Sequence, residues 1–65
     1  MPIYAILWFK NFSPYYEKCY YAFECVTHIP ETFTEVDVPT RDGIFKGIVV
    51  DITTEPKYQI GVYKI

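Results

Sequence analysis

Few residues of this chain combine a reactive side chain with the spacing that catalysis requires. A nucleophile would have to be Ser13, Cys19 or Cys25, with His28 as its base. Ser13 precedes a proline in a predicted turn, and both cysteines lie on a segment rich in aromatic residues, where burial makes a thiol less reactive. Nothing in the sequence places His28 beside any of them, so we predict that the protein is not an enzyme.

Metal and carboxylate chemistry are supported no better. His28 is the only histidine, and the two cysteines do not form a Cys-x-x-Cys pair. Glu35 and Asp37 share one face of an extended segment, about 7 Å apart. Because Val36 and Val38 supply the apolar face, we expect both carboxylates to face water and to protect a sheet edge. We therefore predict no metal site and no cofactor.

The cysteines also bear on the compartment. Cys19 and Cys25 would be about 20 Å apart along one strand, whereas a disulfide needs Cα atoms within about 7 Å. Two free thiols are typical of the cytoplasm. The chain has no apolar run of the roughly 20 residues that a membrane span needs, and its first residues lack the basic segment of a signal peptide. We therefore expect a cytoplasmic protein that does not bind membranes.

Aromatic residues make up 20% of the chain, which is more than a core of this size can bury. The surplus predicts an exposed apolar patch of the kind that binds other proteins. A protein partner or a homodimer is therefore our first functional prediction. The residues expected to form this interface are Trp8, Tyr16 and Phe45.

Single-stranded nucleic acid is the alternative partner. Small β-barrels bind such strands through stacking aromatic rings beside basic side chains. The formal net charge of -2 disfavours an affinity that comes mainly from phosphate contacts. The basic residues that would serve this alternative are Lys10, Arg41 and Lys46.

The elements that must position these residues are strands. Apolar and polar residues alternate with a period of two along most of the 65 residues, and no amphipathic helix is evident. A chain of this length forms one domain, here residues 1–65. We predict an all-β fold: a small five-stranded antiparallel, partly open barrel of the SH3-like or OB-like kind. The expected strands are Ile3–Lys10, Tyr15–Val26, Thr34–Val38, Ile44–Thr53 and Tyr58–Ile65.

Local signals refine this layout. The first and fourth of these segments are apolar on both faces, which predicts central strands. Pro39 indicates an edge strand or the end of a strand. Asp42-Gly43 predicts a tight hairpin turn in which Gly43 has a positive φ, and Gly47 predicts a bulge or a sharp bend.

Part of the chain resembles a known family. The carrying residues are Tyr21-Ala22-Phe23, Val36-Asp37-Val38-Pro39-Thr40-Arg41, Gly43 and Gly47-Ile48-Val49-Val50. They resemble the N-terminal DNA-binding domain of the primosomal replication-restart helicase, and also short β-barrel proteins of bacteriophages. The resemblance implies a small β-barrel, and in the helicase family this domain captures a DNA 3′ end. In the family, an acidic residue that helps hold the strand end lies between the two aromatic residues of the first motif, and here that position is Ala22. The resemblance therefore implies the fold more than the DNA-end function.

Overall fold

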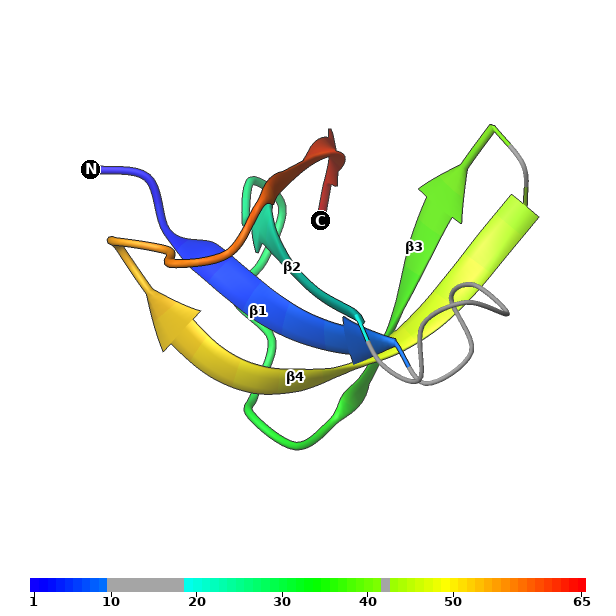
Figure 1. The fold of residues 1–65 in the computed structure, drawn as a ribbon, viewed down its shortest axis with the longest axis horizontal. Coiled ribbons are helices and arrows are strands. Elements are labelled where there is room, and N and C mark those ends of the chain that lie inside the picture. Colours follow the sequence, from blue (N-terminus) through cyan, green and yellow to red (C-terminus); the bar gives the residue numbers. More distant parts are fainter. Residues whose placement is uncertain (10–18, 42) are drawn as a thin grey trace.

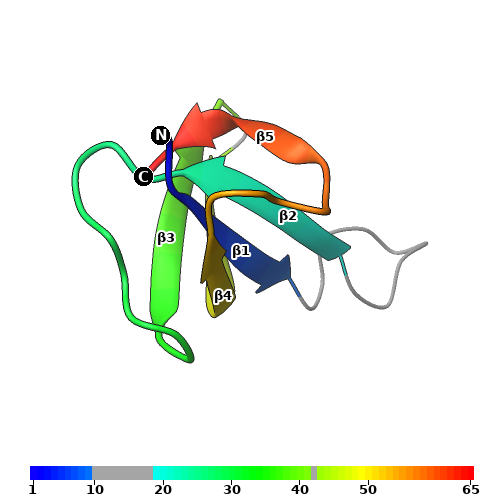
Figure 2. The ribbon, with the colours of Figure 1, turned by 90° about the vertical axis from the view of Figure 1, so that its left-hand side faces the viewer.

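The computed structural model describes residues 1–9, 19–41 and 43–65, without the side chains of Cys19 and Thr40. The described chain is all-β and has no helix, so it also has no helix able to cross a membrane. Its strands form one sheet in the order β3-β4-β1-β2-β5, which curls into a half-barrel (Figures 1 and 2). The strands are β1 (Tyr4–Phe9), β2 (Cys19–Glu24), β3 (Glu35–Thr40), β4 (Gly43–Thr53) and β5 (Ile60–Lys64).

The five-stranded all-β prediction is confirmed, with one correction to strand direction. β1 pairs antiparallel with β2 and β4, and β3 pairs antiparallel with β4. β2 and β5, however, run parallel, so the antiparallel expectation is wrong for this pair. Side chains alternate in the same way in both kinds of pairing. Residue periodicity therefore could not reveal the direction in which β5 joins the sheet.

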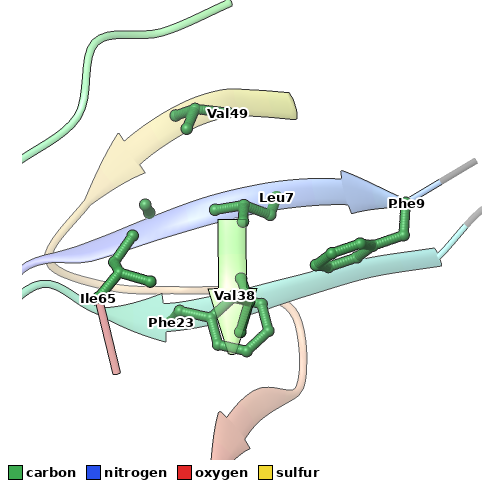
Figure 3. Close-up of a cluster of buried hydrophobic side chains, with 7 residues drawn as sticks. Leu7, Phe9, Phe23, Val38, Val49 and Ile65 are labelled. Atoms are coloured by element: carbon green, nitrogen blue, oxygen red, sulfur yellow. The ribbon is translucent and has the colours of Figure 1, made fainter. Parts of the chain in front are cut away.

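The core lies on the concave face of the sheet. Leu7 at the centre of β1 and Val49 of β4 are fully buried, and Val38 of β3 is almost completely so. Figure 3 shows side chains from different strands converging there. The other face of β1 is also covered, because Ile6 is only 2% exposed where it pairs with Ala22. β1 is thus a central strand, as predicted.

β4 curls the sheet, since it pairs with β3 through its first half and with β1 through its second half. The predicted bulge is not at Gly47, where the pairing with β3 is regular. The register shift lies further along β4, where the partner changes from Val49 to Asp51. Gly47 is needed for space instead, since a Cβ there would lie 2.9 Å from the Phe9 ring and 3.0 Å from Leu7 Cδ2.

The β3–β4 hairpin gives a direct test of the predicted turn. Gly43 pairs with Thr40 and has a φ of 123°, as expected, while Asp42 lies outside the described residues. A Cβ at Gly43 would meet nothing within 4 Å, so the constraint there is the backbone alone. We expect Gly43→Val to cost about 1 kcal/mol or more, because a β-branched residue resists positive φ.

Thermal unfolding measures this cost. Ile44→Val, at the next and exposed position, is the matched control and should change stability by less than about 0.5 kcal/mol. Equal melting temperatures for the two variants would contradict the role of the glycine backbone.

Candidate protein-binding groove

The half-barrel is open between its two edge strands. In the described part of the chain β3 is paired with β4 and β5 with β2, which leaves one edge of each strand without a neighbour. The curl of the sheet brings these edges towards each other across its concave side (Figure 2). A hydrogen bond joins the two sides there: the Arg41 backbone N–H donates to the Tyr63 hydroxyl at 3.2 Å.

Between these edges lies an apolar groove of about 250 Å³, which we call the mouth groove. The described residues that line it include no charged side chain. Its volume is below the roughly 300–1,000 Å³ of typical small-molecule pockets, so it suits one or two large side chains. The lining residues are Phe9, Tyr21, Phe23, Val38, Phe45, Gln59, Ile60, Gly61, Val62 and Tyr63.

The floor of the mouth groove is a cluster of aromatic rings from β1 and β2. Phe9 meets Phe23 edge-on with ring centroids 5.9 Å apart, and meets Tyr21 edge-on at 6.5 Å. The three residues share the concave face because of the pairing of the two strands. Phe9 pairs with Cys19, and Tyr21 and Phe23 follow Cys19 at steps of two residues. Such edge-to-face contacts stabilise the rings beyond simple burial. The floor is therefore held in place by contacts within the chain itself.

β5 forms one wall, and its shape depends on Phe23. Ala22 pairs with Ile60 and Glu24 with Lys64, so β5 advances four residues while β2 advances two. The Phe23 ring occupies the space beside Gly61, where a Cβ would lie 2.3 Å from the ring. This crowding shows that Gly61 faces inward.

Along β5, inward-facing and exposed residues alternate. Tyr63 packs against the core, on the same side as Gly61. The residues that alternate with them, Ile60 and Val62, point away from the core, and Val62 is 85% exposed. An edge strand with bare apolar side chains is a site at which a partner binds or chains aggregate.

The residues predicted to bind a protein do not form one surface. Phe45 is half-buried, packs against the core and lines the mouth groove. Trp8 pairs with Ile48, three residues further along β4, so it lies on the opposite face of the sheet. It lines a separate crevice of about 150 Å³ there. Tyr16 lies outside the described residues.

The residues predicted to bind nucleic acid are also separated. Lys46 lies on the convex face, where it is paired in register with Asp37 and shares the crevice with Glu35. Both carboxylates are exposed, as predicted, and they oppose the positive potential of Lys46. Arg41 is at the hairpin end, beside the mouth groove. Lys10 lies outside the described residues.

Sequence reasoning missed β5 as part of a site. Ile60, Val62 and Tyr63 line the mouth groove, and none of them was a predicted site residue. The available signal was the alternation of Gly61 and Tyr63 on one side with Ile60 and Val62 on the other. Both sides are apolar or small, which is unusual for a strand that forms the edge of a sheet.

Cys25 has a free thiol, as predicted, while the side chain of Cys19 is outside the described part of the structure. Burial raises the pKa of the Cys25 thiol above its ordinary value of 9.0, opposed by a hydrogen bond from the Ala5 backbone and reinforced by Glu24. The folded state therefore holds this proton more tightly than the unfolded chain does. The stabilisation that comes from the protonated Cys25 thiol is complete below pH 9.0, and the free energy of unfolding should fall as the pH rises above 9.0.

Alkylation kinetics test this pKa shift. At pH 8 we expect Cys25 in the Cys19→Ser variant to react more slowly with iodoacetamide than the same variant unfolded in urea. Each rate is divided by that of a free thiol in the same buffer. Equal normalised rates would show that burial does not protect the thiol.

No protein family model matches the chain, and comparisons with curated proteins and with solved structures find no match. The residues that carried the resemblance to the helicase domain lie on β2, β3 and β4 and in the hairpin. The residues of the mouth groove are therefore what points to a function.

Proposed function

We propose that this protein is a non-catalytic binding module that takes a large apolar side chain of a protein partner into the mouth groove. The observation that carries the proposal is the groove itself: about 250 Å³ of space over a floor of aromatic rings, open at a sheet edge. Desolvated pockets of this kind accept the anchor residues that dominate protein interfaces. We place this activity in the cytoplasm.

The distribution of charge favours a protein over a nucleic acid. The described lining of the mouth groove is uncharged, while a nucleic-acid groove needs cations that follow the phosphates. Lys46 lies on the other face of the sheet, near carboxylates, so it cannot bind the same phosphate backbone as Arg41, which lies beside the groove. The net charge of -2 acts in the same direction.

A selection from random displayed peptides tests the proposal. We expect the protein to enrich peptides with a central aromatic or large aliphatic residue, and the Val62→Lys variant to lose them. Titration calorimetry should give a negative heat-capacity change, since apolar surface is buried. Raising the salt from 50 to 200 mM should change Kd by less than about threefold, because few phosphate-like contacts are involved.

A labelled single-stranded oligonucleotide, titrated at the same two salt concentrations, tests the alternative. We expect no measurable binding near physiological salt. Sub-micromolar binding that weakens steeply with salt, together with a peptide selection that enriches nothing, would overturn the proposal and make the chain a single-strand binder.

A further inference from the structure

Phe33, in the turn before β3, is an aromatic side chain held out into solvent. It is 79% exposed and is the only non-glycine residue of the described chain with a positive φ, at 66°. A bulky residue in this backbone region is an outlier that costs stability, and such outliers concentrate at functional sites. Phe33 therefore combines two unfavourable features that a small polar residue would avoid.

The backbone around Phe33 is held by several hydrogen bonds. Its N–H donates to the Val49 carbonyl at 2.5 Å, and the Val49 N–H donates to the Thr34 carbonyl at 3.0 Å. The Thr34 hydroxyl closes the turn by donating to the Glu31 carbonyl at 2.6 Å. A projecting side chain on a fixed backbone loses little entropy when it binds.

The mouth groove matches this side chain in size and character. A dry apolar cavity of about 150 Å³ binds a benzene molecule, so about 250 Å³ accommodates a phenyl ring with its methylene. Phe33 cannot fill the groove of its own chain. Val38, which lines the groove, is five residues further along the extended segment, or about 17 Å, and Figure 2 shows the turn before β3 and strand β5 at opposite ends of the molecule.

Charge complementarity favours a second copy of the chain as the partner. Glu31 and Glu35 flank Phe33 and are exposed. At the mouth groove, the exposed Arg41 lies beside Tyr63, and Lys64 is bound by Glu24 at 2.6 Å. Two exposed carboxylates beside the projecting ring would therefore meet a groove that has the exposed Arg41 at its edge.

We propose that Phe33 of one copy inserts into the mouth groove of a second copy, so that the protein self-associates through a contact between two different surfaces. The proposal rests on the proposed function, because it names the partner of the mouth groove. A contact built on one anchor residue is small, and small interfaces are weak and reversible. We therefore expect association in the micromolar range.

Mixing two variants tests the contact by sedimentation velocity. Phe33→Asn removes the projecting ring but tolerates the positive φ, and Val62→Lys blocks the groove rim with a charge. Each variant alone should be monomeric at concentrations at least tenfold above those at which the wild type associates. An equimolar mixture should form a 1:1 dimer and nothing larger, because only the Phe33 of one variant and the groove of the other remain.

Ile44→Asn is the control, since Ile44 is 68% exposed on the other face of the sheet, and it should associate as the wild type does. Circular dichroism checks folding, and Phe33→Asn should melt at the wild-type temperature or above it. Arg41→Glu should weaken association at least threefold at low salt. A wild type that stays monomeric at 1 mM, a monomeric mixture, or wild-type association by folded Phe33→Asn would overturn self-association. Peptide binding by the mouth groove would still support the proposed function in those cases.

Discussion

Leu7→Ala is expected to leave the protein largely unfolded at 25 °C. The Leu7 side chain is fully buried at the centre of the core, so its loss should cost about 3–5 kcal/mol through lost burial and the cavity left behind. A domain of this size has a total stability of about 3–10 kcal/mol. Urea unfolding followed by circular dichroism measures the effect, with the exposed Ile44→Ala as the control at less than about 0.5 kcal/mol.

Gly47 lies against Leu7 and provides a second test of how tightly Leu7 is packed. A Cβ at Gly47 would lie 3.0 Å from Leu7 Cδ2, an atom that Leu7→Ala removes. Gly47→Ala should therefore cost less in the Leu7→Ala background than in the wild type. Measuring this under conditions in which both backgrounds fold, such as added sulfate, avoids an unfolded reference. Additive effects would mean that the two residues do not share this space.

Gly61→Ala is expected to have the second largest effect. The added Cβ would lie 2.3 and 2.8 Å from Phe23 ring carbons, so either the ring or strand β5 must shift to make room for it. Overpacking of this kind costs about 1–3 kcal/mol. It should also move β5 away from β2, so peptide binding by the mouth groove should fall together with the melting temperature.

A double-mutant cycle with Phe23→Leu isolates this contact. The smaller side chain removes the ring that meets the new Cβ, so the cost of Gly61→Ala should fall by about 0.5–3 kcal/mol in that background. Val62→Ala, at the adjacent exposed position, is the control and should leave stability nearly unchanged. An equal cost of Gly61→Ala in both backgrounds would show that Phe23 is not the constraint.

The two open edges explain how so small a sheet keeps an open groove. A closed barrel would pair β3 with β5 and fill its interior with side chains. Here the Arg41 to Tyr63 hydrogen bond crosses that gap, and Phe45 and Val38 reach the space that closure would have filled. A partner that covers these edges would stabilise the fold by mass action.

The sequence by itself determined the strands and much of their order of burial. β1 and β4 are apolar on both faces and are central, Pro39 lies in an edge strand, and Gly43 has the positive φ that its turn requires. These features could be predicted because each depends on a residue's own conformational limits or on alternation with a period of two. They involve neighbours that are close in the chain.

Only the tertiary structure decided how those strands create a site. The parallel entry of β5, the separation of Phe45 from Trp8 onto opposite faces, and the meeting of Phe23 with Gly61 all join residues remote in sequence. Alternation is the same for either strand direction and does not say which face becomes concave. The curl of β4 determines which face is concave, because it turns one apolar face inward to form the core. Val62 stays exposed at the mouth groove.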